Sequence, residues 1–461
     1  MTQQAPPLTS GALPILGHAV EFQRNRTQLM QRGFAEHGPV FGLKLANQNV
    51  AVVIGPEHQK QFFMETDGRL SIQEPYKFLQ AMFGEALFLA PHDKYLEQRP
   101  LVQELFKRDK MLLYVDIMQE VVQEWLDGLG DSGEIELVSE IGTLVQEVAG
   151  DCFLGKEVNR AVGREFWDLY TDVGKALDPL LPPNLPLPKF KKRDKAKARM
   201  TEILGPIIAE RRANPDQYND FLQDIINKAG EDGKPVDEEM VRNLLMALMF
   251  AGHETTAGQA AWTLIFLLQH PDYRQKVLNE IDAVAPAGEH ITPKRMVQLD
   301  HIAWAVREVE RLRPSADMLM RVVKEDIEFG DYLIPAGWLV QVAQEIGHKL
   351  PEQFEQPERF DPLRFAPDRA EDKQHRFNLI GFGGGMHKCT GMNFANNEMT
   401  IITALMLRQF ELELVTQNTE ILRGLGANRP TPTVIRYRRR ETAVNQAIED
   451  QNLEIDPISS L

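Results

Sequence analysis

A glycine-rich stretch late in the chain, GFGGGMHKCTG at residues 381–391, contains Cys389, one of only two cysteines. His387 lies two residues before it, so in an extended segment both side chains would face the same side and the imidazole could activate a thiolate nucleophile. That chemistry leaves the glycines unexplained. A metal-bound thiolate accounts for them, because glycines let the backbone approach a large flat cofactor and backbone amides can hydrogen-bond the sulfur.

Two other segments carry charged residues whose spacing suits either a surface or a buried cluster. EVERLRP places Glu308 and Arg311 three residues apart, and RFDPLRF supplies Arg364. Taken alone, a Glu–Arg pair at this spacing is most often an exposed pair on one helix face. Two guanidinium groups can also share one buried carboxylate, and removing one partner would then cost roughly 3–5 kcal/mol.

The stretch AGHETT places Glu254 and Thr255 in the centre of a long apolar segment. The threonine hydroxyls could simply bond back to the carbonyls of the preceding helical turn. An acid next to an alcohol can also deliver protons to a reacting group. The residues alone leave both interpretations open.

The stretch FGGGMHKCTG resembles F-x-x-G-x-[HR]-x-C-x-G, the haem-binding signature of the cytochrome P450 superfamily. Phe382, Gly385, His387, Cys389 and Gly391 occupy the matching positions. The EVER, RFDPLRF and AGHETT stretches resemble further motifs of the family and stand in the expected order. This resemblance implies a mainly α cytochrome P450 fold, a large helical domain with a small β-rich N-terminal lobe, and Cys389 as the axial iron ligand of haem b.

The resemblance also implies roles for the other motifs. Glu308, Arg311 and Arg364 would form a buried structural cluster beneath the haem. On the opposite side, Thr255 would support iron-bound dioxygen and Glu254 would feed protons toward it.

Four further residues match positions that bind the haem propionates in the family. Arg99 belongs to an aromatic-x-x-x-basic element, Arg321 lies in MLMRVV, and His387 lies in the cysteine loop. Tyr76 matches a tyrosine that would hydrogen-bond a propionate. A guanidinium suits this role because it can bind a carboxylate through two hydrogen bonds.

Within the superfamily the chain is most similar to the sterol 14α-demethylase branch. The stretches that carry this similarity are YKFLQAMFGE, MFAGHETTAG, LRPSADMLMR, TGMNFA and TVIRYRRR. It implies a substrate cavity walled by Phe78, Met82, Phe83, Leu248, Ala251, Ala316, Asp317 and Met318. Two residues depart from that branch: Glu254 replaces a histidine, and Asp317 stands where bulky apolar residues face the substrate. A buried carboxylate requires a partner, so Asp317 either turns toward one or recognises a polar group of the substrate.

We therefore expect a haem-thiolate monooxygenase that inserts one oxygen atom of O2 into a bulky lipophilic substrate such as a sterol, a triterpenoid or another polycyclic compound. Electrons would come from a separate ferredoxin or flavodoxin, since Cys152 alone cannot hold an iron–sulfur cluster. The alternatives are a true sterol 14α-demethylase, a peroxide-driven or isomerising haem-thiolate enzyme, and a non-enzymatic haem sensor or carrier. The Glu254–Thr255 pair counts against the last two.

The elements that must position these residues can be read from composition and periodicity. Helical spacing dominates residues 56–313, and its longest segment, 237–270, is apolar on nearly every side, so we expect a buried helix. Residues 39–55 predict a β-hairpin, and short β-like runs follow residue 314. Residues 1–440 are expected to form a single domain, and 441–461 a polar, acidic tail.

Net charge and hydropathy exclude several classes of partner. The formal net charge of −16 argues against nucleic acid as the main ligand. The N-terminal segment lacks the roughly 20 consecutive apolar residues that a membrane span requires. We therefore expect no transmembrane segment and a cytoplasmic location.

Overall fold

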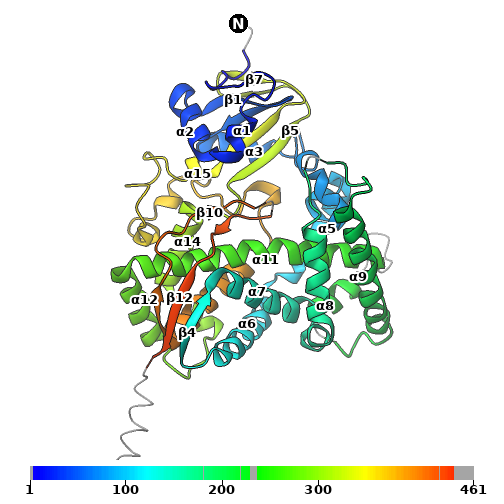
Figure 1. Cartoon of the computed structure of the whole chain (residues 1–461), viewed down its shortest axis with the longest axis vertical. Helices are drawn as coiled ribbons and strands as arrows, with labels where there is room; N and C mark the ends of the chain where they lie inside the picture. The colour runs from blue at the N-terminus through cyan, green and yellow to red at the C-terminus, as the bar shows by residue number, and fades with distance from the viewer. Residues whose placement is uncertain (1–3, 180, 219, 229–235, 425, 441–461) are drawn as a thin grey trace, which may run out of the picture.

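A computed structural model describes residues 4–179, 181–218, 220–228, 236–424 and 426–440. A lobe that contains most of the larger sheet lies at one end of the molecule, above a larger body of helices in the view of Figure 1. This architecture confirms the predicted mainly α fold with a small β-rich lobe. The predicted tail at 441–461 lies outside the described residues, and the single domain over 1–440 stays a prediction.

Helices make up most of the described chain. Their bounds are α1 (Ala19–Arg24), α2 (Arg26–His37), α3 (Pro56–Met64), α4 (Gln80–Phe83), α5 (His92–Leu105), α6 (Arg108–Gly128), α7 (Leu137–Phe153), α8 (Lys156–Gly174), α9 (Pro188–Ala213), α10 (Phe221–Asn227), α11 (Glu238–Gln269), α12 (Pro271–Val284), α13 (Pro293–Met296), α14 (Asp300–Leu312), α15 (Gln344–Gly347) and α16 (Met392–Gln409). Short 3₁₀ turns are η1 (Glu74–Leu79), η2 (Leu87–Leu89), η3 (Pro362–Phe365), η4 (Glu371–Lys373) and η5 (Gly385–His387). None of the described helices is long and apolar enough to cross a lipid bilayer.

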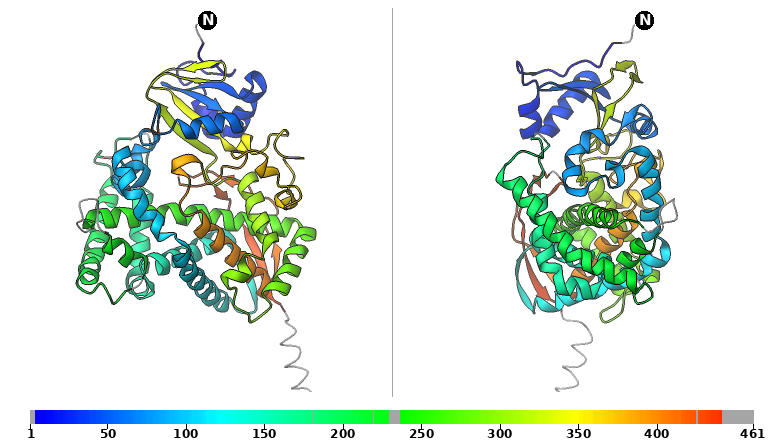
Figure 2. Two further views of the ribbon diagram at one scale, coloured as in Figure 1. Left: turned by 180° about the vertical axis from the view of Figure 1, so that it is seen from behind. Right: turned by 90° about the vertical axis from the view of Figure 1, so that its right-hand side faces the viewer.

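The long buried helix predicted at 237–270 is confirmed as α11. It begins after Asp237, whose side chain accepts a hydrogen bond from the backbone N–H of Met240 at 2.7 Å and so satisfies a free amide of the first turn. A helix with so little polar surface is stable only when other elements cover it. In Figure 1 it crosses the helical body, and in the right-hand view of Figure 2 it is seen nearly along its axis with other helices around it.

The larger sheet has five strands in the order β1-β2-β8-β5-β3. β1 (Val40–Leu45) and β2 (Gln48–Val53) form the predicted hairpin, and Leu45 pairs with Gln48 next to its turn. β8 (Leu339–Ala343) pairs in parallel with β2, and β5 (Met318–Val323) joins β8 to β3 (Leu70–Ser71). The lobe is therefore not purely N-terminal, because periodicity predicts strands and not which distant strands pair.

Three smaller sheets lie elsewhere in the described chain. β4 (Ser132–Glu136), β12 (Val434–Arg439) and β9 (Phe410–Leu414) form a sheet with β12 in the middle. β6 (Ile327–Phe329) pairs with β7 (Tyr332–Ile334), and β10 (Ile421–Leu422) pairs with β11 (Arg429–Pro430). β3 and β4 are short interruptions of the interval 56–313 in which helix was expected.

Candidate active site

The cysteine loop runs from the end of an extended segment to the first turn of α16. The backbone N–H of Cys389 donates to the carbonyl of Phe382 at 2.9 Å, which closes the loop. Gly383 and Gly385 have φ angles of 71° and 64°, a left-handed conformation that other residues rarely adopt. A side chain at Gly385 would also lie 3.0 Å from the carbonyl oxygen of Phe63 in α3. The glycines thus shape the loop and let it pack against α3.

Cys389 is exposed, whereas Cys152 is buried. The protein around Cys389 raises the pKa of its thiol through desolvation, while a hydrogen bond from the Gly391 backbone N–H and the charge of Lys388 act to lower it. A backbone amide directed at the sulfur and a nearby lysine both favour the thiolate, the form that binds a metal. The thiol is therefore accessible and has partners that stabilise its anion.

The central turn of α11 is accessible, although the helix is buried on both sides of it. Ala251 is exposed and Thr255 is half-buried, while the residues before and after this turn are buried. The hydroxyl of Thr255 donates to the backbone carbonyl of Ala251 at 2.6 Å. Accessible surface in the middle of an otherwise buried helix gives a ligand access to this turn.

Glu254 points to a different side of α11 than Thr255, because adjacent helical residues do not share a face. A side chain at Gly426 would lie 2.5 Å from one carboxylate oxygen of Glu254, so the carboxylate lies against the segment before β11. Burial and the nearby Glu254 charge raise the pKa of Tyr170 in α8. The acid lies between α8 and the C-terminal segment, and the alcohol lies at the accessible turn.

The structure brings the predicted charged cluster together. Glu308 accepts two hydrogen bonds of 2.8 Å from Arg311 and contacts Nε of Arg364 at 3.1 Å, and all three side chains are fully buried. The backbone N–H of Asp361 donates to the same carboxylate at 2.9 Å. A buried carboxylate with two guanidinium groups and an amide is fully satisfied, as a stable buried ion cluster requires.

Two members of this cluster were missed in the sequence. Glu371 accepts a hydrogen bond from Nη1 of Arg364 at 2.6 Å, so the second guanidinium has a carboxylate of its own. The backbone carbonyl of His348 accepts a hydrogen bond from Arg311 at 2.9 Å. Burial, and the charge of Arg311, lower the pKa of His348 to about 3 and keep its imidazole neutral. The neighbouring sequence contains no motif that marks either residue.

Tyr76 and Arg321 lie close together between η1 and β5. The Tyr76 hydroxyl accepts a hydrogen bond from the backbone N–H of Met320 at 3.2 Å. The Arg321 guanidinium packs over Phe62 and donates to the hydroxyl of Thr66 at 3.1 Å. Burial lowers the pKa of Arg321 to about 10. A buried guanidinium that donates hydrogen bonds to a neutral hydroxyl and a neutral backbone carbonyl suits an incoming carboxylate.

His387 binds a carboxylate of the protein itself. Its Nε2 lies 2.6 Å from the carboxylate of Asp67, and its ring stacks on Tyr95 with centroids 4.3 Å apart. Burial acts to raise the pKa of Asp67, but the hydrogen bond and charge of His387, with the charges of His92 and Arg321, outweigh it, and the pKa is lowered. Asp67 has no sequence signal beyond its place in a turn. The propionate role of His387 stays a prediction.

Arg99 of α5 lies near this group. Its charge acts to lower the pKa of Tyr95, which burial raises. The Nε atom of Arg99 is buried without a hydrogen-bond partner. An unsatisfied buried guanidinium nitrogen is costly, so this atom also suits an incoming acceptor.

The predicted cavity residues differ in how much surface they expose. Phe78, Ala316 and Met318 are half-buried, as is much of the accessible turn around Ala251. Met82, Phe83 and Leu248 are buried in the largest hydrophobic core. These three side chains therefore pack beneath the more exposed residues and contribute little surface of their own to a cavity.

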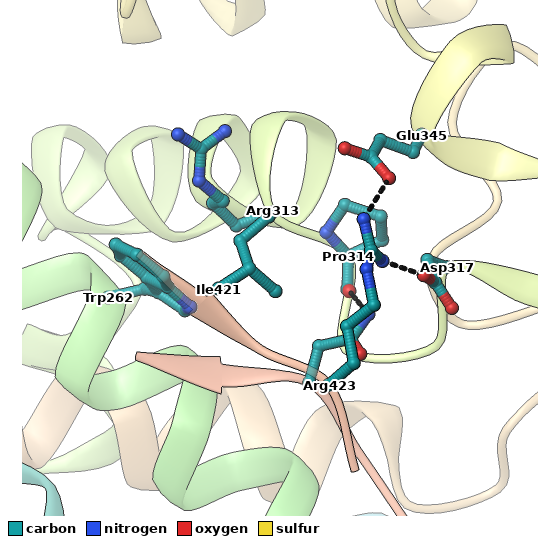
Figure 3. Close-up of a pocket in the computed structure, with 8 residues that line it drawn as sticks. Trp262, Arg313, Pro314, Asp317, Glu345, Ile421 and Arg423 are labelled. Atoms are coloured by element: carbon teal, nitrogen blue, oxygen red, sulfur yellow. Dashed lines mark hydrogen bonds and ion pairs between the residues drawn. The ribbon is translucent and has the colours of Figure 1, made fainter. Parts of the chain in front are cut away.

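Asp317 turns toward two arginines from distant segments. Its carboxylate accepts hydrogen bonds from Arg26 of α2 at 3.1 and 3.2 Å and pairs with Arg423. Figure 3 shows Arg423 between Asp317 and Glu345, with Arg313 directed away from both. The small pocket drawn there is lined by Trp262, Arg313, Pro314, Asp317, Glu345, Ile421, Arg423 and Asn428, none of which belongs to the cysteine loop or the accessible turn of α11.

Comparison with known proteins agrees with this geometry. The family model described as Cytochrome P450 matches residues 6–434. A sterol 14-demethylase of Arabidopsis thaliana is 31% identical over 454 residues, which cover 95% of this chain and 92% of that protein. A sterol 14alpha-demethylase of Mycolicibacterium vanbaalenii is 31% identical and covers 94% of this chain and 98% of its own length. A lanosterol 14-alpha demethylase of Bos taurus is 28% identical over 95% of this chain and 90% of its own length.

Solved structures share the fold. The retinoic acid-bound cyanobacterial CYP120A1 superposes with a TM-score of 0.85 at 24% identity, over 95% of this chain and all of that one. The haem domain of cytochrome P450DA superposes with a TM-score of 0.86 at 20% identity, over 96% of this chain and 99% of that one. At these identities the likeness shows the fold alone.

The chain belongs to the cytochrome P450 family and is a haem monooxygenase of that family. Its fold, its haem cofactor and its need for O2, a lipophilic substrate and a source of electrons follow from this membership. The residues present fit a haem: an accessible thiol at Cys389, a buried guanidinium at Arg321 and an unsatisfied Nε at Arg99.

Proposed function

We propose that this chain is a haem b monooxygenase in which Cys389 is the axial ligand and the accessible turn of α11 faces the reacting oxygen. Its substrate is a sterol, a triterpenoid or another bulky polycyclic compound. The observation that carries the proposal is the combination of an accessible thiol ahead of α16 with an accessible turn, which contains Thr255, in the middle of the long and otherwise buried helix α11. Haem b fits because the two cysteines do not form the C-x-x-C-H pattern of covalently attached haem.

Arg321, Tyr76 and Arg99 would hold the propionates. Arg321 and Arg99 offer guanidinium groups to carboxylates, and the Tyr76 hydroxyl can donate to one while it accepts from Met320. Nε2 of His387 is already bound to the carboxylate of Asp67, so this nitrogen would orient Asp67 and would not bind a propionate directly.

Bound haem supplies the iron at which dioxygen is reduced, and the protein supplies the protons. Thr255 presents its hydroxyl at the accessible turn, where it can donate to an oxygen atom and exchange its proton. Glu254 lies on the side of α8 and the C-terminal segment, from which its carboxylate would relay protons toward the turn. The neighbouring apolar side chains, Phe78 and Met318 among them, exclude water from the substrate.

The electrons come from a ferredoxin or a flavodoxin. Lys388 precedes the thiolate ligand and is exposed, so it offers a cation to an acidic carrier close to the haem.

A sterol 14α-demethylase is the second candidate, favoured by the names of the relatives. Glu254 and Asp317 depart from that branch, and Asp317 is occupied by Arg26 and Arg423. The identity of about 31% leaves room for another polycyclic substrate.

The ligand assignment is tested by replacing Cys389 with serine. The reduced carbon monoxide adduct of the wild type should absorb at about 450 nm, which marks a thiolate ligand, and Cys389→Ser should abolish that band. Cys152→Ser is the matched control and should keep it, because this cysteine is buried in the core. Survival of the band in Cys389→Ser would refute the assignment.

The substrate class is tested by titrating the ferric protein with lipophilic compounds. Compounds that displace water from the iron shift the Soret band, so sterols, triterpenoids and linear lipids of matched hydrophobicity can be ranked by affinity. We expect the polycyclic compounds to bind most tightly. Preferential binding of linear lipids would contradict the proposed class, and removal of a 14-methyl group from a bound sterol would establish the second candidate.

A further inference from the structure

Glu310 lies on α14 between the two predicted cluster residues, but its side chain extends to the cysteine loop. A Cβ atom at Gly381 would lie 2.4 Å from Cγ of Glu310 and 2.5 Å from its Oε1. The carboxylate also accepts a hydrogen bond from the backbone N–H of Gly381. Glu310 therefore fits against Gly381, and any side chain at position 381 would displace it.

Two successive backbone amides at the start of the loop are held by side chains. The N–H of Ile380 donates to Nε2 of His348 at 3.0 Å, and the N–H of Gly381 donates to Glu310. The next residue, Phe382, accepts the N–H of Cys389 at 2.9 Å. The position of Cys389 thus depends on a short backbone segment that Glu310 and His348 fix from two different elements.

The carboxylate of Glu310 also lies against the start of the loop that carries the thiol. Burial raises the pKa of Glu310 to about 7, against the lowering effects of Arg307, the Gly381 amide and Lys388, and with a raising effect of Asp372. The Glu310 carboxylate meets the loop at Gly381, one residue before Phe382, whose carbonyl accepts the N–H of Cys389. Helix α14 therefore places a buried carboxylate against the start of the loop, where its negative charge adds to that of the thiolate.

We propose that Glu310 is a positioning residue of the cysteine loop and that its carboxylate increases electron donation from the Cys389 thiolate to bound haem iron. Hydrogen bonds and charges around a thiolate ligand tune the reduction potential of its iron. A nearby negative charge stabilises the ferric form relative to the ferrous form, so it lowers the potential. The inference rests on the proposed ligation by Cys389.

Three variants of Glu310 separate its hydrogen bond from its charge in the haem-loaded full chain. Glu310→Gln keeps an acceptor for the Gly381 amide and removes the charge, Glu310→Asp keeps the charge, and Glu310→Leu removes both. Glu358→Gln is the matched control, because Glu358 is 70% exposed and pairs with Lys349. The ferric–ferrous potential is measured at pH 8, and the thiolate-ligated fraction is the share of the carbon monoxide adduct that absorbs at about 450 nm.

We expect Glu310→Gln to shift the potential to more positive values with its 450 nm fraction unchanged, and Glu310→Asp to stay closer to the wild type. Glu310→Leu should shift the potential and lose part of the 450 nm fraction, and Glu358→Gln should change neither. An unchanged potential in Glu310→Gln would overturn the electronic role. A full 450 nm fraction in Glu310→Leu would overturn the positioning role.

The 450 nm band of the wild type and of Cys389→Ser distinguishes a wrong role for Glu310 from a wrong ligand assignment. If the wild type lacks the 450 nm band, or Cys389→Ser keeps it, then the ligand assignment is wrong. If both controls behave as expected and the Glu310 variants match the wild type, the ligand assignment stands and only the role of Glu310 is rejected.

Discussion

The backbone N–H of Ile380 donates a hydrogen bond to Nε2 of His348, and this bond connects the buried charged cluster to the cysteine loop. His348 is itself held by Arg311, which donates to its backbone carbonyl at 2.9 Å. The imidazole can accept from Ile380 only while this nitrogen carries no proton. The cluster therefore orients the loop through a neutral histidine, in addition to the contact that Glu310 makes.

Because His348 is neutral in the folded protein, we expect the free energy of unfolding to fall as the pH is lowered. Burial and Arg311 lower the folded-state pKa of His348 from 6.5 to about 3, so between these values the unfolded chain binds a proton that the folded chain does not. The stabilisation is complete above about pH 6.5 and is lost as the pH falls toward 3, by up to ~1.4 kcal/mol per pH unit. Urea unfolding at pH 6.5, 5.5 and 4.5 should show a shallower decline for His348→Gln than for the wild type. Equal slopes would contradict this assignment.

Arg364 should be among the most costly residues to replace. Its guanidinium is fully buried and binds both Glu308 and Glu371, so Arg364→Leu removes one cationic partner from each of two buried carboxylates. We expect the free energy of unfolding to fall by about 3–5 kcal/mol, together with loss of haem content. Arg436→Leu is the control: this arginine also binds two glutamates, but it is 53% exposed and should cost no more than about 1 kcal/mol. Similar losses in both variants would argue against a special role for the buried cluster.

Asp317 should act in stability more than in substrate recognition. Asp317→Asn weakens the pairing with Arg26 and Arg423, and we expect the free energy of unfolding to fall by about 1–3 kcal/mol with haem binding unchanged. The affinity for polycyclic compounds in the Soret titration should stay within a few-fold of the wild type. Asp331→Asn, at an exposed position, should change neither quantity. A large rise in sterol affinity for Asp317→Asn would show instead that this residue selects against plain sterols.

The features predicted from sequence are those carried by short segments. Glu308 and Arg311 share one helical turn, and the apolar length of α11 is a local property. The partners of Asp317 could not be predicted, because Arg26 and Arg423 lie 291 and 106 residues away and only the packing of α2 and the β10 region brings them there. The same reason applies to the pairing of β2 with β8.

The site shows the same division between local and distant residues. The cysteine loop was recognisable because its glycines and its thiol are adjacent in the chain. Asp67 acts on this loop from the turn after α3 and Glu310 acts on it from α14, and each looks like an ordinary surface acid in its own segment. Their roles became visible only once the atoms they contact were known.

Proton delivery by Thr255 is tested by Thr255→Ala. The hydroxyl is at the accessible turn, so its loss should let electrons be used without product and release hydrogen peroxide instead. A positioned proton donor contributes ~10²–10⁴-fold in general, and water entering the same turn can replace part of this, so we expect product per electron pair to fall at least about tenfold. Product and peroxide are measured together, with a substrate taken from the Soret titration and a surrogate ferredoxin.

Thr263→Ala is the matched control for this experiment. Thr263 makes the same back-bond on α11, to the carbonyl of Gln259 at 2.8 Å, but its side chain is fully buried. Its replacement removes a helical hydroxyl and leaves the accessible turn unchanged. The yield of product per electron pair, the coupling, should therefore stay at the wild-type level. If Thr255→Ala keeps wild-type coupling, the Thr255 hydroxyl only bonds back to the Ala251 carbonyl and delivers no proton. If both variants lose coupling equally, the effect belongs to the geometry of α11 and not to a proton at Thr255.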